Sequence, residues 1–314
     1  MSTGRVVVLA GGLSPERDVS IRSGRRVADA LRVAGVDVGV LDADSHLLAN
    51  LAANRPACVV PLLHGAPGED GAIRDVLESL DLPYVGSTPV AARRAFDKPV
   101  ASGLVREAGV AAPASVALPH ATFRELGAAA VLDAVVAHLG LPLMVKPTRG
   151  GSSLGCTVVR DAADLPAAMV AAFAYGDTAM IERFVTGTEV AISVVEDAEG
   201  PRALPVVEIS ADGGFYDYGA RYTAGATEFF VPAHLSEPVL AACAELALTV
   251  HRTLGLRDWS RSDVIVDADG TPWFLEVNVA PGMTETSTYP QAVAASGTDL
   301  GTLTQGLVER ALNR

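Results

Sequence analysis

Residues 143–155 read LMVKPTRGGSSLG, a short apolar run that ends in lysine and proline and leads into glycines and serines. The apolar run favours a strand, and the glycines favour a flexible loop. Backbone N–H groups and two hydroxyls beside an ammonium group are typical of a phosphate-binding loop, although the lysine precedes the glycines, unlike in the Walker pattern. An ordinary Gly/Ser hairpin turn would have the same composition, so the stretch alone leaves both interpretations open.

Lysine usage favours the phosphate interpretation. The chain has 24 Lys plus Arg, and only Lys98 and Lys146 are lysine, which leaves 24 − 2 = 22 arginines. A position that escapes this bias needs a compact, strongly hydrated charge rather than a planar guanidinium. Phosphate oxygens held in a tight pocket are one such need.

A second polar cluster lies in residues 259–287, WSRSDVIVDADGTPWFLEVNVAPGMTETS. Its Asp-Gly pair between two β-rich runs predicts a hairpin. Asp263 lies on one strand, and Glu276 and Asn278 lie two residues apart on the other, so their side chains share a face. Three oxygen ligands suit Mg²⁺, whereas the alternative is a solvated acidic face. The surrounding FLEVNV is typical of a buried strand, where charge needs a partner.

The order of apolar and amphipathic segments predicts a mixed fold. Strands at 5–12, 36–44 and 57–65 alternate with helices over the first hundred residues, which predicts a parallel α/β layer. Residues 109–119 are interpreted as a connection. Beyond it we expect an α+β unit, with strands at 143–147, 156–160, 179–185 and 189–196, one helix at 161–176, and a long helix near 236–255.

Composition limits the classes of partner and compartment. A net charge of −13 disfavours binding to nucleic acid and to anionic membranes. The three cysteines have no CxxC spacing, so we expect neither a disulfide framework nor a zinc site, but three buried thiols. The apolar run at 6–10 is too short for a signal peptide or a membrane span, which predicts a cytoplasmic protein of two or three domains.

Four motifs in this order resemble the ATP-grasp enzymes, most closely the D-alanine–D-alanine ligases: residues 11–24 (GGLSPERDVSIRSG), 64–71 (HGAPGEDG), 146–155 (KPTRGGSSLG) and 276–287 (EVNVAPGMTETS). The resemblance implies an α/β and α+β protein. Its N-terminal parallel domain would span residues 1–97, and two α+β subdomains, at 98–186 and 187–314, would clamp ATP. It also implies a homodimer.

The resemblance implies the nucleotide and metal residues one by one. Lys98 and Lys146 would hold the phosphates. Residues assigned to the rest of ATP are Glu182, Phe184 and Val185 at the adenine, Glu189 at the ribose, and Phe215, Arg221 and Leu275. Asp263, Glu276 and Asn278 match ligands of two Mg²⁺ or Mn²⁺ ions, with Glu276 bridging them.

The implied reaction phosphorylates one D-alanine carboxylate, and the amine of a second D-alanine attacks the acyl phosphate. Arg261 and the N–H of Gly282 would stabilise the anionic intermediate. Residues that match substrate contacts are Glu16 at the first ammonium, His64 at its carboxylate, Ser152 and Tyr222 in a triad with Glu16, and Ser287 with Thr288 at the second substrate. Taken singly, His64 could be structural, and Glu16 could cap the following helix.

Three departures from the family pattern keep alternatives open. Arg221 stands where lysine is usual, Arg74 where glutamine is common, and Thr288 where leucine is usual. A ligase with a different acceptor, such as D-serine, in resistance or specialised metabolism is therefore an alternative. A nucleotide-binding regulator without catalysis is a second alternative, although Arg261 has no purpose in a mere ATP binder.

Overall fold

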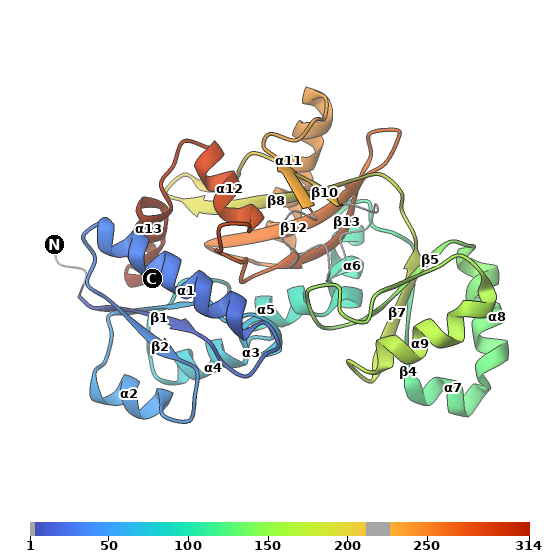
Figure 1. Ribbon diagram of the computed structural model, residues 1–314, viewed down its shortest axis with the longest axis horizontal. Helices are drawn as coiled ribbons and strands as arrows, with labels where there is room; N and C mark the ends of the chain where they lie inside the picture. Colours follow the sequence, from blue (N-terminus) through green and yellow to red (C-terminus); the bar gives the residue numbers. More distant parts are fainter. Residues whose placement is uncertain (1–3, 212–226) are drawn as a thin grey trace.

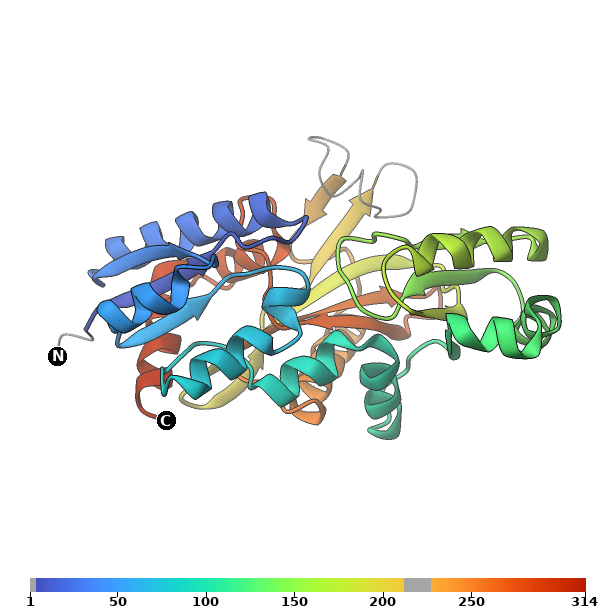
Figure 2. The same cartoon turned by 90° about the horizontal axis from the view of Figure 1, so that it is seen from below.

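The computed structural model describes residues 4–211 and 227–314, which form three β-sheets spaced along the long axis of the molecule (Figure 1). A three-stranded parallel sheet lies at one end and a four-stranded antiparallel sheet lies at the other. A six-stranded antiparallel sheet lies between them, and Figure 2 shows the same order from below. The predicted combination of a parallel α/β layer with α+β units is confirmed.

The parallel sheet has the order β2–β1–β3. Its strands are β1 (Val6–Ala10), β2 (Val38–Asp42) and β3 (Cys58–Pro61), and its helices are α1 (Arg17–Val33), α2 (Leu47–Ala53), α3 (Ala66–Glu69) and α4 (Ala72–Ser79). Every residue of β1 is buried, as expected for the central strand of a parallel sheet that helices cover. Because β1 and β3 are parallel, the loops that follow them emerge at the same edge of the sheet. Ligands bind at this edge in open parallel sheets.

Two consecutive helices connect this sheet to the rest of the chain. α5 (Pro89–Phe96) begins after Thr88, whose side chain accepts a hydrogen bond from Ala91 N, and α6 (Lys98–Glu107) begins after Asp97. A capping side chain followed by proline in the first turn is a strong start signal in both helices. α6 packs against strand β13 of the six-stranded sheet, so its first residue, Lys98, lies beside that strand.

The four-stranded sheet has the order β4–β7–β5–β6 and its own core. Its elements are β4 (Ser115–Pro119), α7 (His120–Leu126), α8 (Ala128–Leu139), β5 (Leu143–Pro147), β6 (Thr157–Val159), η1 (Ala162–Asp164), α9 (Leu165–Phe173) and β7 (Thr178–Arg183). The interpretation of residues 109–119 as a connection alone is wrong, because β4 lies within them and pairs antiparallel with β7. As an edge strand, β4 tolerates Pro119 at its last position.

The six-stranded sheet has the order β11–β10–β8–β12–β13, with β9 also paired to β8. Its elements are β8 (Thr188–Asp197), β9 (Gly200–Ala203), β10 (Val207–Ala211), β11 (Thr227–Phe230), β12 (Trp259–Val266) and β13 (Pro272–Asn278), with helices α11 (Glu237–Thr253), α12 (Thr288–Ala295) and α13 (Leu300–Leu312). Trp259 shares one apolar core with Val6 of the parallel sheet, so these two sheets pack against each other.

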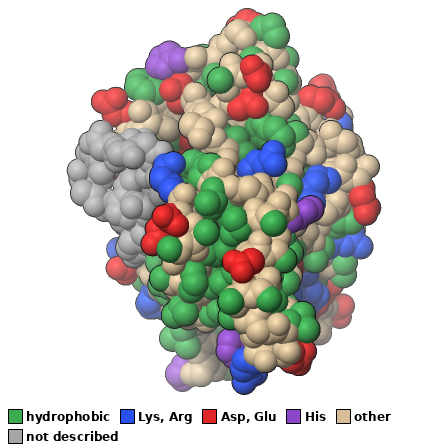
Figure 3. Space-filling view, turned by 90° about the vertical axis from the view of Figure 1, so that its right-hand side faces the viewer, with side chains coloured by type: hydrophobic (Ala, Val, Ile, Leu, Met, Phe, Trp, Pro, Cys, Tyr) green, Lys and Arg blue, Asp and Glu red, His purple; other side chains and the backbone are tan. Residues whose placement is uncertain are grey.

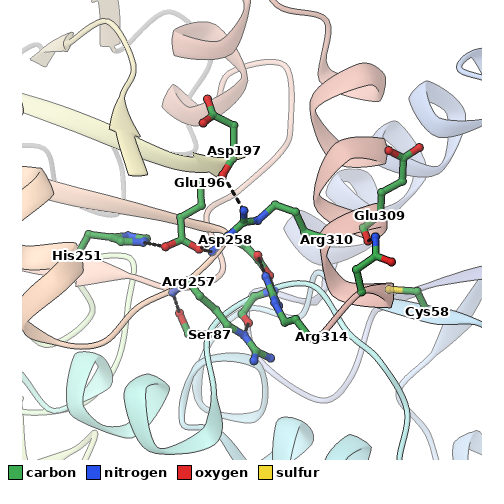
Figure 4. A network of polar contacts seen from close by, with 12 residues as sticks. Cys58, Ser87, Glu196, Asp197, His251, Arg257, Asp258, Glu309, Arg310 and Arg314 are labelled. Carbon is green, nitrogen blue, oxygen red and sulfur yellow. Dashed lines mark hydrogen bonds and ion pairs between the residues drawn. The ribbon is translucent and has the colours of Figure 1, made fainter. Parts of the chain in front are cut away.

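A network of buried polar contacts joins the parallel-sheet unit to the six-stranded sheet (Figure 4). The Asp258 carboxylate is fully buried and accepts hydrogen bonds from Gly86 N at 2.6 Å and from both terminal nitrogens of Arg314. Arg257 Nε donates to the Gly86 carbonyl oxygen, so Gly86 is held from both sides. Because α5 and α6 follow this segment, the network fixes the start of α5, the helix that leads to Lys98 at the first position of α6.

Removing the Arg314 guanidinium is expected to destabilise the fold. Arg314→Met leaves the buried Asp258 carboxylate without a cationic hydrogen-bond donor among the described residues, and an uncompensated buried charge costs about 3 kcal/mol. The matched control is Arg252→Met, which removes an exposed pair with Glu245 and should cost less than about 1 kcal/mol. Urea unfolding of both variants measures the difference, and equal midpoints would contradict this role for Arg314.

The surface of the described residues carries a mixture of hydrophobic and charged side chains. In the described residues, no helix is long and apolar enough to cross a membrane. Figure 3 views the end of the molecule formed by the four-stranded sheet unit, where hydrophobic side chains occupy the middle and charged side chains lie among and around them. Scattered apolar surface of this kind is usual.

Candidate active site

Two adjoining cavities lie where the three sheets approach one another. One has a volume of about 600 Å³ and is lined by β5, β7 and the segment from Phe184 to Glu189. The other, of about 300 Å³, lies between the parallel-sheet loops and the end of β13. Residues common to both linings are Lys98, Gly150, Gly151, Ile209, Asp263 and Glu276. The two cavities therefore meet at a shared wall that carries one cation and two carboxylates.

The larger cavity collects the residues assigned to ATP. The predicted residues that line it are Lys98, Lys146, Glu182, Phe184, Val185, Glu189 and Leu275. Phe215 and Arg221, also assigned to ATP, lie outside the described residues, as does Tyr222. The volume of the larger cavity and the mixture of apolar and polar groups in its lining suit a nucleotide.

The quoted stretch 143–155 forms strand β5 and the loop to β6, and this loop lines both cavities. Since β5 and β6 pair antiparallel, the loop is also a hairpin connection, and the two interpretations are compatible. Gly150, Ser152 and Ser153 all have positive φ values, of 134°, 54° and 56°. Successive residues in this region turn backbone N–H groups inward, which is typical of anion-binding loops.

The two lysines lie in this region, each against a glutamate. Lys146 Nζ is 2.6 Å from Glu182 Oε1, and both side chains are buried. Lys98 Nζ is 3.0 Å from Glu276 Oε2 and donates to the Gly150 carbonyl oxygen at 2.7 Å. Burial lowers the pKa of Lys98, but the Glu276 carboxylate more than offsets this and leaves that pKa above its usual value. Both lysines are therefore buried and paired with a carboxylate.

Lys146→Arg is expected to weaken ATP binding, although arginine is the basic residue at every position of the chain except Lys98 and Lys146. The guanidinium is wider and disperses its charge, so it cannot occupy the buried space beside Glu182 without displacing neighbours. We expect KM for ATP to rise by about tenfold, or about 1.4 kcal/mol. The control is Arg252→Lys, an exposed basic residue outside both cavity linings, and unchanged ATP kinetics in Lys146→Arg would show that an ammonium is not required.

Strands β12 and β13 place four polar side chains on one face. In the strand register Asp263 lies opposite Glu276, and Arg261 lies opposite Asn278, so all four side chains line the smaller cavity. The shared face of Asp263, Glu276 and Asn278 was predicted, and Arg261 also lies on it. Arg261 donates to both carboxylate oxygens of Asp263, at 2.7 and 2.8 Å. This fork-to-fork geometry fixes both side chains.

The oxygen donors on this face fit Mg²⁺, although the protein supplies only part of the coordination shell. In the residues described, no three His, Cys, Asp or Glu side chains gather as a metal cluster. Asp263 and Glu276 offer carboxylate oxygens, and Asn278 Oδ1 already accepts a hydrogen bond from Ala280 N. Such a set of two carboxylates and one amide oxygen suits an ion that takes its remaining ligands from phosphate and water.

The smaller cavity collects the residues assigned to the amino-acid substrates. The predicted residues that line it are Glu16, His64, Ser152, Arg261, Gly282, Ser287 and Thr288. Ser152 Oγ donates to Glu16 Oε1, which joins residues 136 positions apart across the cavity. Glu16 stands at the N-cap position of α1, but its side chain makes no cap hydrogen bond to that helix.

His64 lines the cavity, but both its ring nitrogens contact protein atoms. Nδ1 lies 3.0 Å from the Ala280 carbonyl oxygen, and Nε2 lies 3.3 Å from Ser23 Oγ, which accepts from Met283 N. Burial, with a smaller contribution from the positive charge of Arg261, lowers the pKa of His64 to about 4. A neutral ring that donates from Nδ1 satisfies this chain of contacts, which holds the segment containing Gly282.

The segment after β13 presents Gly282 and Ser287 side by side. Ser287 Oγ accepts a hydrogen bond from Thr284 N at 3.1 Å, and an added Cβ at Gly282 would lie 2.8 Å from Ser287 Oγ. The close approach explains why glycine stands at this position. Thr288 is the first residue of α12 and is buried against the same cavity.

Sequence reasoning gave no role to several cavity residues, among them Glu69 and Cys156. Glu69 lies within the GEDG motif but was given no role, although it is a buried carboxyl group at the end of α3, in the glycine-rich motif that begins at His64. Cys156 lines the larger cavity and is only partly buried, so the expectation of three buried thiols is wrong for it. Arg74, a departure noted above, is fully buried and donates to the Gly68 carbonyl oxygen beside Glu69.

Comparisons with known proteins agree with this geometry. A family described as "D-ala D-ala ligase C-terminus" matches residues 104–309. The D-alanine–D-alanine ligase of Bordetella petrii is 41% identical over 308 residues, which cover 98% of this chain and 92% of that protein.

Solved structures cover nearly the whole chain as well. The VanG D-Ala:D-Ser ligase of Enterococcus faecalis superposes with a TM-score of 0.84 at 26% identity and covers 98% of this chain and 99% of its own. The D-alanine–D-alanine ligase of Bacillus anthracis, solved with ATP, has a TM-score of 0.82 at 26% identity and covers 99% and 98%. The fold is therefore the ATP-grasp fold, and the chain belongs to the D-alanine–D-alanine ligase family.

Proposed function

We propose that this protein joins two D-alanines in an ATP-dependent reaction that forms D-alanyl-D-alanine and ADP. One observation carries the proposal: a nucleotide-sized cavity and a smaller polar cavity share a wall made of Lys98, Asp263 and Glu276. A phosphoryl group transferred from one cavity to a carboxylate in the other would cross this wall. That arrangement has no use in a protein that only binds a nucleotide.

The first step forms an acyl phosphate. Lys146 and Lys98 bind the phosphates of ATP and keep the γ-phosphoryl group aligned with a carboxylate oxygen of the first D-alanine. Glu16, held by Ser152, takes the ammonium group of that D-alanine. Alignment and charge neutralisation are the main sources of catalysis in phosphoryl transfer, because the protein contributes little covalent chemistry.

Asp263, Glu276 and Asn278 would hold one or two Mg²⁺ or Mn²⁺ ions at the shared wall. The ions would neutralise charge on the phosphoryl oxygens during the transfer.

The second step joins the two amino acids. The amine of the second D-alanine attacks the acyl carbon, and the negative charge that develops on the acyl oxygen is stabilised by Arg261 and the N–H of Gly282. His64 and Ser23 hold the segment that carries this N–H, so their role is to position it. Ser287 takes the carboxylate of the second D-alanine.

D-Serine is the second candidate acceptor. Thr288, buried beside the smaller cavity, is smaller than leucine and adds a hydroxyl that can meet a polar side chain. A paired hydroxyl discriminates strongly between substrates, whereas a methylene in an apolar pocket changes binding by only about 1–3 kcal/mol. We therefore expect D-alanine at both positions and D-serine as a slower second substrate.

The product would serve peptidoglycan precursor synthesis in the cytoplasm, and we propose a homodimer as the working form. We also retain the division into units 1–97, 98–186 and 187–314. The separate core of residues between Leu132 and Ile181 supports the middle unit.

The test is a screen of ADP release with D-amino acids and D-hydroxy acids, in which each product is identified by mass. We expect ADP release to depend on D-alanine and to yield the D-alanyl-D-alanine mass. Rapid product formation only with another acceptor would identify the alternative ligase. ATP binding without ADP release on any substrate would favour the regulator.

A further inference from the structure

One chemical requirement of the proposed reaction has no assigned residue. An amino acid carries an ammonium group at neutral pH, and an ammonium has no lone pair with which to attack a carbonyl carbon. A group in the smaller cavity must therefore accept a proton from the second amino acid before the peptide bond forms.

Most acids and bases of the described cavity lining are already engaged by other groups. Glu16 accepts from Ser152, Asp263 is paired with Arg261, and Glu276 is paired with Lys98. His64 has both ring nitrogens in contact with protein atoms. Each of these groups already serves a substrate, a cation or the backbone.

Glu69 differs from them. Its side chain is buried in the wall of the cavity, and Oε1 accepts a hydrogen bond from Gly65 N at 2.9 Å. Oε2 accepts no hydrogen bond from a described residue, and it is not fully enclosed by protein atoms. The geometry leaves one oxygen anchored and the other available to the cavity.

We infer that Glu69 is the proton acceptor for the amine of the second amino acid. This inference rests on the proposed ligase function. In the step, one ammonium proton moves to Glu69 Oε2, and the freed nitrogen lone pair forms a bond to the acyl carbon. The tetrahedral intermediate then expels phosphate as its C–O bond breaks, and the second nitrogen proton leaves on a phosphate oxygen.

The surroundings tune Glu69 for this task. Burial, together with the negative charge of Glu16, raises the pKa of Glu69 to about 8. A base works best when its pKa lies close to the operating pH. Charged groups that face Glu69 from the neighbouring elements are Glu16 and Glu276, which raise its pKa, Arg261, which lowers it, and the cations Arg74 and Lys98.

The sign of the pH dependence follows from this pKa. Below about pH 8 Glu69 is mostly protonated and cannot accept a proton, so dipeptide formation should be slow. The rate should rise as the pH passes through about 8 and level off above it.

The decisive variant is Glu69→Gln, which keeps an oxygen for Gly65 N–H but cannot take up a proton. Positional isotope exchange within ATP measures acyl phosphate formation independently of the amine. We expect that exchange to stay within about twofold of wild type while dipeptide formation falls by roughly 100-fold, the lower end for loss of a general base. The matched control is Glu78→Gln, which accepts from Tyr84 Oη and lies outside both cavity linings.

A wild-type dipeptide rate in Glu69→Gln would overturn the inference, because a residue that only caps Gly65 tolerates the amide. Loss of isotope exchange together with dipeptide formation would also overturn it, since Glu69 would then act in the first step. Absence of ADP release in the wild type would instead refute the ligase function itself.

A second test uses the wild-type protein alone, so its result does not depend on whether a variant folds. 3-Fluoro-D-alanine has a less basic amine than D-alanine. If titration of Glu69 causes the break in the pH–rate profile, the break stays at the same pH with both substrates. A break that moves down with the amine pKa would assign the titration to the substrate and overturn the inference.

Discussion

Glu276→Gln is expected to reduce phosphoryl transfer from ATP by more than about 100-fold while leaving the fold intact. The change removes a charge and hardly any volume. Glu276 lies in the wall shared by the two cavities and pairs with Lys98 at 3.0 Å. Without this carboxylate the proposed Mg²⁺ ions lose their central ligand, and Lys98 loses the partner that positions it.

Initial rates of ADP release at saturating ATP and D-alanine, over a range of Mg²⁺ concentrations, measure the effect. The matched control is Asp269→Asn, which removes an exposed carboxylate from the turn of the same hairpin. The control should retain activity. Wild-type turnover of Glu276→Gln at saturating Mg²⁺ would mean that the carboxylate is only structural.

Arg261→Met is expected to lower the rate of dipeptide formation by about 10²–10³-fold, the usual cost of removing one group that stabilises an oxyanion. Methionine keeps much of the side-chain volume but supplies no positive charge and leaves Asp263 without its forked partner. Arg261→Lys retains the charge without the fork, so its activity should lie between those of wild type and Arg261→Met.

The measurement compares kcat for the dipeptide with KM for ATP. We expect kcat to fall and KM for ATP to change little, because Arg261 lines only the smaller cavity. A rise in KM for ATP with unchanged kcat would place Arg261 in nucleotide binding and contradict the proposed role.

The sequence predicted the elements whose signals are local. An Asp-Gly turn between two β-rich runs is sufficient for the β12–β13 hairpin, and period-2 spacing places Glu276 and Asn278 on one face. The scarcity of lysine pointed to Lys98 and Lys146, and both line the nucleotide-sized cavity. These inferences needed only neighbours in the chain or a count of residue types.

Contacts between distant segments could not be predicted in this way. His64 contacts Ala280 across 216 positions, and Gly86 contacts Asp258 across 172. Neither pair carries a periodic signal, because tertiary packing alone brings the partners together. Strand β4 was missed for a similar reason, since its pairing with β7 outweighs the weak local signal of a proline-containing run.

The central claim is that a carboxylate in one cavity receives the phosphoryl group of an ATP bound in the other. D-Alanine labelled with ¹⁸O in its carboxylate tests this claim most directly, with the released phosphate analysed by mass. An acyl phosphate predicts that each dipeptide formed transfers one labelled oxygen from the first D-alanine to phosphate. Dipeptide or ADP formation with unlabelled phosphate would show that the phosphoryl group never reached the carboxylate, and would contradict the account.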